Sequence, residues 1–383
     1  MENESIASAC DRFDVPDDVC YLNCAYMSPL LKAVRDAGHR GVDRKAAPWR
    51  ITPQDFFAEA EEARALFAAL IGAEADDIAL TTSAGYGLAV AALNAPLGPG
   101  HTVVLMADEF PAAYYTWKAA ADRAGATLRI ATQAPSQSWT DALLAAIDSS
   151  VRVVSVSPCH WTDGEPVALA PLRARCDEVG AQLVLDATQW VGAAPFSVAE
   201  LRPDYVAVAT YKWLLGPYSF GFLYVAPRHQ DGRPLDESWI NRAGSDDFRR
   251  LTNYEAGYRA GARRFDLGEP SNFILLPMVI AALRQLLAWD VAAISAGLRS
   301  ITSSIAGQLR AANVAPERLS SGSPHIVGLT LAPPIPEGLG AWFAERRIYV
   351  SLRGTKMRIA PHLYVRPADV ERFVAAVVEA GLV

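Results

Sequence analysis

Up to residue 225, hydrophobic residues gather into short runs that are separated by longer stretches with helical spacing. Seven of the runs have the length of buried strands, namely 78–82, 102–106, 127–131, 151–156, 182–186, 204–209 and 220–225. The intervening segments repeat apolar side chains at helical intervals, chiefly at 86–94, 111–124, 138–147 and 170–179. This alternation predicts an α/β fold with a doubly wound, mostly parallel seven-stranded sheet.

The pattern changes after the last of these strands. Residues 227–265 are rich in Arg, Asp and Gly and predict a long excursion without regular structure. Besides a helix at 55–71, we expect two helices, three short strands and a last helix, at 273–289, 291–312, 325–331, 347–352, 356–360 and 367–381. The chain should therefore comprise an N-terminal arm (1–30) that packs with the small domain, a large domain (31–270) and a small α+β C-terminal domain (271–383).

Composition narrows the classes of function. The 383 residues have a net charge of −7 and a pI near 5.5, which argues against nucleic acid as the main partner because phosphate binding needs a basic face. No apolar run approaches the length of a membrane helix, and the acidic N-terminus does not resemble a signal peptide. The five cysteines lack metal-binding spacing. We expect a cytoplasmic protein with reduced thiols, no bound metal and no membrane partner.

One lysine has an unusual position. Lys212 follows the apolar run Asp204-Tyr-Val-Ala-Val-Ala-Thr-Tyr and precedes Trp-Leu-Leu-Gly-Pro, so it lies just after a buried strand and before a turn. A lysine amine that is removed from water has a lowered pKa and is neutral more often. A neutral amine can attack a carbonyl carbon and form a Schiff base.

An acidic residue ends the preceding strand. The run Ala181-Gln-Leu-Val-Leu is followed by Asp186, and the carboxyl ends of parallel strands meet at one edge of the sheet. A buried carboxylate can hold the ring nitrogen of pyridoxal phosphate (PLP) in its protonated form. Lys212 and Asp186 together suggest a PLP site.

These segments, with others in the same order along the chain, resemble the class V aminotransferase-like PLP enzymes. The matching residues include Asp186-Ala-Thr-Gln189-Trp-Val-Gly, Tyr211-Lys212-Trp-Leu-Leu-Gly-Pro, Thr82-Ser-Ala-Gly-Tyr-Gly, Glu109-Phe-Pro, Arg263-Arg-Phe-Asp-Leu-Gly and Met357-Arg-Ile-Ala-Pro-His. That group includes cysteine desulfurases, kynureninases, epimerase-like proteins and several aminotransferases. The resemblance spans nearly the whole chain and implies the PLP-dependent transferase fold of type I.

The resemblance also implies which residues bind the cofactor. Gln189 would donate to the phenolic oxygen of the ring, and Phe110 would stack on the ring. The phosphate would lie on the turn formed by Ser83, Ala84 and Gly85, where backbone N–H groups at a helix start favour an anion. Tyr211 is expected to help to hold the phosphate.

Substrate contacts come from other matching segments. Arg358 corresponds to the arginine that binds the α-carboxylate of the substrate, and Arg353 is the alternative for that role. A guanidinium group can bind a carboxylate through two parallel hydrogen bonds. His160 and Tyr26 lie in segments that face the substrate in related proteins, although a structural histidine is an equal alternative for His160.

The family arrangement implies a homodimer in which the loop at Gly268–Asn272 reaches the site of the other subunit. Glu269 stands in this loop where the family pattern has a threonine. A carboxylate would repel the phosphate, so the alternatives are that Ser271 or Asn272 replaces the threonine or that the loop points elsewhere.

The reaction itself is less well defined by the sequence. Desulfurases have a nucleophilic cysteine between the segments that match Val350-Ser-Leu-Arg353 and Met357-Arg358, and here only Gly-Thr-Lys joins them. Persulfide-forming desulfuration is therefore disfavoured. The sequence favours an aminotransferase acting on a small-molecule amino acid, with a PLP-dependent lyase or epimerase as the alternative.

Overall fold

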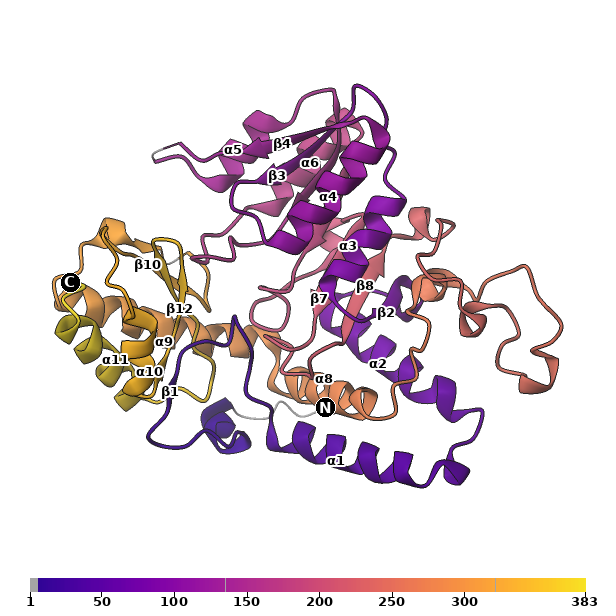
Figure 1. The fold of residues 1–383 in the computed structure, drawn as a ribbon, viewed down its shortest axis with the longest axis horizontal. Helices are drawn as coiled ribbons and strands as arrows, with labels where there is room; N and C mark the ends of the chain where they lie inside the picture. Colours follow the sequence, from indigo (N-terminus) through magenta and orange to yellow (C-terminus); the bar gives the residue numbers. More distant parts are fainter. Residues whose placement is uncertain (1–5, 135, 321) are drawn as a thin grey trace.

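A seven-stranded sheet forms the centre of the larger part of the molecule in the computed structural model, which describes residues 6–134, 136–320 and 322–383 (Figure 1). The strands are β2 (Ile78–Thr81), β3 (Thr102–Met106), β4 (Thr127–Ala131), β5 (Val151–Val156), β6 (Gln182–Asp186), β7 (Tyr205–Ala209) and β8 (Gly221–Val225). Their order across the sheet is β2-β8-β7-β6-β5-β3-β4. Only β8 pairs antiparallel with its neighbours, β2 and β7, while the other pairs are parallel. The predicted α/β fold with a mostly parallel sheet is confirmed.

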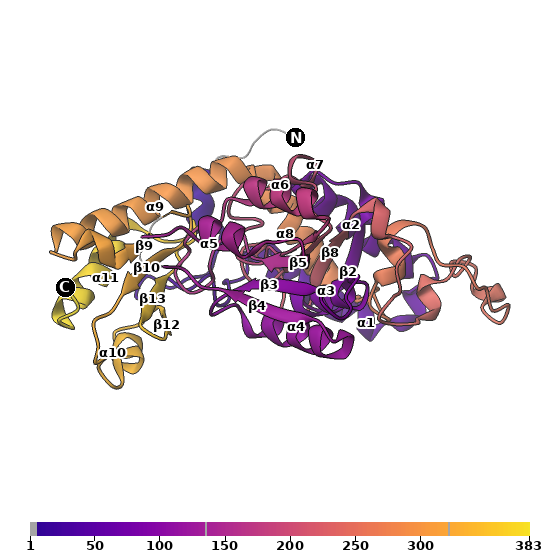
Figure 2. The same ribbon diagram turned by 90° about the horizontal axis from the view of Figure 1, so that it is seen from above.

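Helices cover both faces of this sheet (Figure 2). Alternate strand residues such as Val103 and Val184 pack against α3 (Ala84–Leu93) and α4 (Pro111–Ala124). The opposite set, such as Val104 and Leu185, faces a larger core shared with α2 (Asp55–Ile71), α5 (Trp139–Ala146), α6 (Leu169–Val179) and α8 (Leu275–Trp289). Because strand side chains alternate between faces, these continuous apolar runs bury both sides of the sheet.

The C-terminal part contains a second sheet of four strands in the order β12-β13-β10-β9. These strands are β9 (Leu319–Ser320), β10 (Val327–Thr330), β12 (Ser351–Arg353) and β13 (Lys356–Ile359), and all their pairings are antiparallel. Helices α9 (Val291–Ala311), α10 (Leu339–Glu345) and α11 (Pro367–Glu379) belong to the same region (Figure 1).

The N-terminal segment runs beside this C-terminal part. Strand β1 (Cys20–Tyr21) pairs in parallel with β11 (Ile348–Tyr349). Helix α1 (Lys32–Ala46) then crosses to pack along α8. The division at residues 30 and 270 stays a prediction.

The segment between β8 and α8 contains no α-helix or strand among its described residues, only four short 3-10 turns, η4 (Pro227–His229), η5 (Trp239–Asn241), η6 (Phe248–Arg250) and η7 (Gly261–Phe265). Part of this segment between β8 and α8 projects from the body of the molecule (Figure 1). Within the described chain, no single helix has the length and hydropathy of a membrane span; α8 and α9 meet that criterion only as a pair bent by 79°.

Candidate active site

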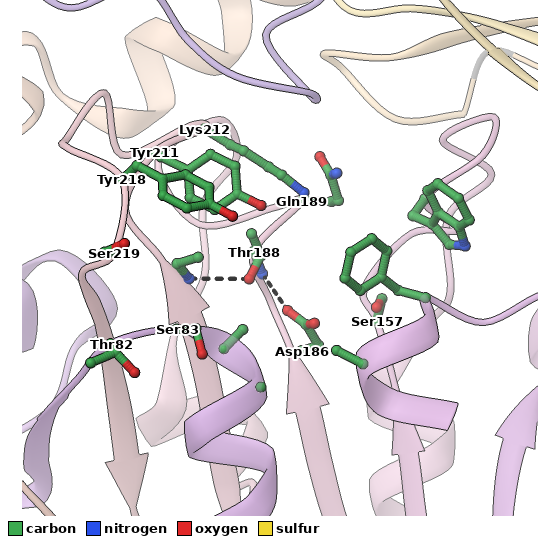
Figure 3. A pocket seen from close by; sticks show the side chains of 16 residues that line it. Thr82, Ser83, Ser157, Asp186, Thr188, Gln189, Tyr211, Lys212, Tyr218 and Ser219 are labelled. Carbon is green, nitrogen blue, oxygen red and sulfur yellow. Dashed lines mark hydrogen bonds between the residues drawn. The ribbon is translucent and has the colours of Figure 1, made fainter. Parts of the chain in front are cut away.

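A cavity of about 400 Å³ lies at the carboxyl ends of β6 and β7, beside the start of α3 (Figure 3). Asp186 is the last residue of β6, and Lys212 lies three residues beyond the end of β7. The start of α3 closes another side of the cavity with Ser83, Ala84 and Gly85. The sheet topology thus brings together three segments that are far apart in the sequence.

Lys212 is 6% exposed, and its amine faces this cavity. The Nζ atom lies 5.4 Å from the centroid of the Phe110 ring and 5.3 Å from that of Tyr211. Burial, followed by the positive charge of Arg358, lowers the pKa of Lys212 to about 8, although Asp186 acts in the opposite direction. A substantial fraction of this amine is therefore neutral near pH 8.

Asp186 is fixed by its own strand end. Its Oδ1 accepts a hydrogen bond from the backbone N–H of Thr188 at 3.1 Å, and the Thr188 hydroxyl accepts one from the N–H of Ala209 on β7 (Figure 3). Burial raises the pKa of Asp186, while the bonds from Thr188 and the charge of Lys212 lower it. A cationic group placed against this carboxyl would favour its ionised form.

The first turn of α3 is suited to bind an anion. Ser83 is its N-cap, and the Ser83 hydroxyl accepts the N–H of Tyr86 at 3.1 Å. The N–H groups of Ala84 and Gly85 precede the intrahelical ladder and line the cavity. Gly87 allows the helix to approach the sheet, because a Cβ there would lie 3.0 Å from Ala207 Cβ. Because α3 begins at the cavity, the positive end of its helix dipole points into it.

Aromatic rings form the walls of the cavity. Phe110 and Trp161 meet edge to face with centroids 5.4 Å apart, and Tyr211 and Tyr218 lie 4.6 Å apart. The Trp161 ring is held by a 2.7 Å hydrogen bond from its Nε1 to the carbonyl of Asp108. Such walls limit the access of water and offer flat surfaces to a ring.

A second recess of about 250 Å³ shares these aromatic residues and Lys212 with the cavity. Arg358, Arg353 and Tyr26 line it, as the sequence predicted for the substrate side. Arg358 is 2% exposed and donates from Nη1 to the carbonyl of Trp161 at 2.6 Å. Its Nε is buried without a partner among the described residues. Burial and then the charge of Arg353 lower the pKa of Arg358 to about 9.

Two of the predicted residues have hydrogen-bond partners within the protein. Gln189 lines the cavity, but its amide donates to the carbonyl of Ala25 and accepts from Trp213 Nε1, which leaves one N–H for a ligand. His160 lines neither recess. Its Nδ1 and Nε2 contact Thr162 Oγ1 and the carbonyl of Ala107, and its ring stacks on Trp139. This arrangement fits the structural alternative for His160, because a buried polar network occupies both ring nitrogens.

The loop at 268–272 lies outside both recesses. Its residues bond locally: the carbonyl of Gly268 accepts from Ser238, Ser271 donates to the carbonyl of Phe56, and Asn272 Oδ1 accepts the N–H of Leu275 at the start of α8. Ser271 and Asn272 thus have structural partners within their own chain.

Several residues that line the cavity were not predicted as site residues. Thr188 connects β6 to β7, Trp161 forms a wall of both recesses, and Tyr218 and Ser219 follow the Gly-Pro turn after Lys212. The threonine between Asp186 and Gln189 was a usable signal, since both neighbours were selected. Trp161 likewise follows the selected His160, in a segment that the family resemblance places near the cofactor. Tyr218 had no such signal, because only the folded chain places it beside Lys212.

These groups fit PLP. The cavity offers a buried lysine with a lowered pKa, a buried carboxyl that needs a cationic partner and a helix start for a phosphate. They occupy separate sides of one space of about 400 Å³, and aromatic rings lie between them. Among the described residues, no group of three or more His, Cys, Asp or Glu side chains could hold a metal ion.

Comparison with known proteins gives the family. The model for aminotransferase class-V matches residues 38–351. An uncharacterized aminotransferase of Bacillus subtilis (strain 168), YcbU, is 28% identical over 264 residues, which cover 68% of this chain and 66% of that protein. The isopenicillin N epimerase of Streptomyces clavuligerus is 25% identical over 82% of this chain and 83% of its own length. In three of the sequence relatives, the match to this chain covers only 66%, 52% and 53% of the relative's own length.

Solved structures show the same fold. A mutant of C-DES with glycine covalently linked to its PLP cofactor superposes with a TM-score of 0.86, covering 96% of this chain and 98% of that one. The identity is 18%, so this likeness concerns the arrangement of the elements.

Proposed function

The chain belongs to the class V aminotransferase family, and we propose that it is a PLP-dependent aminotransferase acting on a small-molecule amino acid. The observation that supports the proposal most directly is the convergence of Lys212, Asp186 and the start of α3 on one cavity. When bound there, PLP supplies an aldehyde that condenses with an amine and a ring that accepts electrons from the substrate Cα.

The residues on each side of the cavity would bind a different part of the cofactor. Lys212 would hold the cofactor covalently, and Asp186 would bind the protonated ring nitrogen. Ser83 and the N–H groups of Ala84 and Gly85 would bind the phosphate. Phe110 would stack on the ring and exclude water, and Tyr211, whose ring lies at a similar distance from the Lys212 amine, would help to hold the phosphate.

Lys212 also suits proton transfer. With a pKa near 8, its amine is close to half-protonated at mildly alkaline pH, so it can take the proton from the substrate Cα and return it. Arg358 is placed to orient the substrate, because its unpartnered Nε and the recess beside Lys212 suit a carboxylate. Fixing the α-carboxylate fixes which bond to Cα is aligned for reaction.

A persulfide-forming reaction is disfavoured by the positions of the thiols. Cys24 and Cys159 lie near the site, but both are fully buried, line neither recess and have pKa values raised by burial. The turn between β12 and β13 contains only Gly354 and Thr355. Neither of these two thiols is therefore exposed or readily ionised, as a nucleophilic thiolate must be.

We further propose that the protein is a homodimer. The family arrangement that the sequence resembles is a homodimer, and the described chain leaves large aromatic side chains such as Trp49 and Tyr254 79% and 94% exposed. A light-scattering mass at the elution peak of a sizing column should equal twice that of the chain. A monomer mass across the micromolar range would contradict this.

The reaction is tested by following the absorption spectrum of the purified holoenzyme while amino acids are added singly without a keto acid. Transamination predicts loss of the yellow chromophore, formation of pyridoxamine phosphate and one equivalent of keto acid. Return of the chromophore with keto acid and ammonia accumulating would mean a lyase. Exchange of the Cα proton with inversion and no keto acid would mean an epimerase.

A further inference from the structure

Two arginines project from one face of the β12–β13 ribbon. The register pairs Ser351 with Arg358 and Arg353 with Lys356. Residues that are opposite in an antiparallel pair share a face, and so do residues two apart on one strand. Arg353, Arg358 and Lys356 therefore lie on the same face, with Arg353 and Arg358 as diagonal neighbours.

Both guanidinium groups rest near the same indole ring. The Cζ atoms of Arg353 and Arg358 lie 5.7 and 5.9 Å from the centroid of Trp161. They also line the same recess of about 250 Å³, which opens to Lys212. One small space beside the reacting amine is thus bordered by two guanidinium groups.

The partners of these three cations differ. Lys356 pairs with Asp163 at 3.3 Å and donates to Thr330 Oγ1. Within the described part of the chain, Arg353 and Arg358 have no carboxylate within 4.0 Å, and no Asp or Glu lines their recess. Arg353 donates from Nη1 to the neighbouring carbonyl of Leu352. A guanidinium has five N–H donors, so each arginine retains donors for a ligand.

A single carboxylate would neutralise only one of these two arginines. We propose, on the basis of the proposed function, that the substrate carries a second carboxylate and that Arg353 binds it while Arg358 binds the α-carboxylate. The substrate class is an amino acid with an acidic side chain, or the corresponding dicarboxylic keto acid. The planar fork of a guanidinium matches the two oxygens of a carboxylate.

The charge of Arg353 also acts on its surroundings. It lowers the pKa of the buried Arg358. It also lowers the pKa of Lys212, although its effect there is smaller than those of Arg358 and Asp186. Like charges held this close repel each other unless an anion lies between or beside them. A dicarboxylic substrate would relieve that repulsion.

The test compares isosteric amino acids on the holoenzyme, glutamate with glutamine and aspartate with asparagine, and includes O-phospho-L-serine. We expect a ratio of kcat/KM, acid over amide, of roughly 10 to 100 for one pair, from one charge-assisted carboxylate contact. A ratio near one for both pairs would overturn the proposal. A clear preference for O-phospho-L-serine would overturn the carboxylate assignment.

Arg353→Gln should reduce the ratio to near one, because it should slow the acid far more than the amide. Equal losses for acid and amide would place Arg353 at the α-carboxylate and contradict the assignment. Lys356→Gln is the matched control, since it removes a neighbouring cation that is already paired with Asp163. It should change the ratio by less than about fivefold.

A binding measurement separates this inference from the proposed function. Calorimetry with glutarate and with its monoamide needs no turnover, and the wild type should bind glutarate at least roughly tenfold more tightly. If no amino acid changed the spectrum but glutarate were still preferred and Arg353→Gln removed the preference, the proposed reaction would fail and the carboxylate site would stand. Equal binding of both compounds would overturn the site.

Discussion

The amine of Lys212 lies 5.4 Å from the centre of the Phe110 ring, although 101 residues separate them in the chain. The contact exists because Phe110 caps the start of α4, after β3, while Lys212 follows β7 in the same sheet. Removing Lys212 from water in this way is the main cause of its lowered pKa. The sheet thus creates a reactive amine from an ordinary lysine.

Capture of PLP by the apoprotein should depend on pH through Lys212. Because its pKa is lowered to about 8, the neutral amine is abundant above that pH and scarce below it. Stopped-flow measurements should show an association rate that rises with pH, with its midpoint near pH 8 and a plateau at higher pH. Arg358→Met should move the midpoint upward, since Arg358 is the strongest charge lowering this pKa. A midpoint near the ordinary lysine value of 10.5 would contradict the account.

Arg358→Ala should impair the reaction of every amino acid. Losing a two-point, charge-assisted contact costs about 3 kcal/mol, so kcat/KM should fall on the order of 100-fold. The loss should appear mainly in KM, and cofactor retention on a desalting column should stay close to the wild type. An unchanged KM would move the α-carboxylate role to Arg353.

Asp204 should make the fold sensitive to acid. Burial raises its pKa, but hydrogen bonds from His229 and the N–H of Leu183, with the charge of Arg228, lower it to about 2. A carboxyl with a lowered pKa stabilises the fold above its unfolded value and loses this effect as pH falls through about 4 to 2. The contribution at neutral pH should be about 2–3 kcal/mol.

Urea unfolding between pH 3 and pH 7 measures this contribution. Asp204→Asn should lower stability at pH 7 and reduce its decline toward pH 3. Asp177→Asn is the control, because that carboxylate is half exposed in its ion pairs with Arg173 and Arg202. Equal pH profiles for the wild type and Asp204→Asn would reject the assignment.

Asp266→Asn should destabilise the fold, because Asp266 joins Arg64 to strand β2. Arg64 and Asp266 are 0% and 1% exposed and form two parallel bonds of 3.0 and 2.7 Å, and Asp266 also accepts the N–H of Leu80 on β2. Breaking a buried pair from one side costs about 3–5 kcal/mol. Denaturant unfolding measures the loss, with Glu62→Gln as an exposed control; similar stabilities for both variants would show that the pair contributes little.

The large sheet was predictable because its strands are short, strongly apolar runs. Each predicted strand from 78–82 to 220–225 agrees with the structure to within a residue at either end. The reversed direction of β8 was not predictable, because pairing is a long-range property. Helix α1 was not expected, since its buried face consists largely of small residues such as Gly38 and Gly41. A Cβ at Gly41 would lie 2.7 Å from the carbonyl of Phe273, so this face serves close helix packing.

The site was predictable where a residue marks a strand end, as Asp186 and Lys212 do. It was not predictable where geometry depends on side-chain partners. His160 is withdrawn into a bonded network, and Arg353 and Arg358 meet Trp161 from a different sheet. Neither the hydrogen bonds of His160 nor the contacts of the two arginines with Trp161 produce a recognisable pattern in the sequence.

The most direct test of the central claim is to locate the covalently held cofactor. The purified protein, saturated with PLP, is reduced with borohydride, digested and analysed by mass spectrometry. The account predicts one phosphopyridoxyl group per chain, on the peptide that contains Lys212, and none in Lys212→Ala. Attachment at another lysine, or no attachment together with no yellow chromophore, would contradict it.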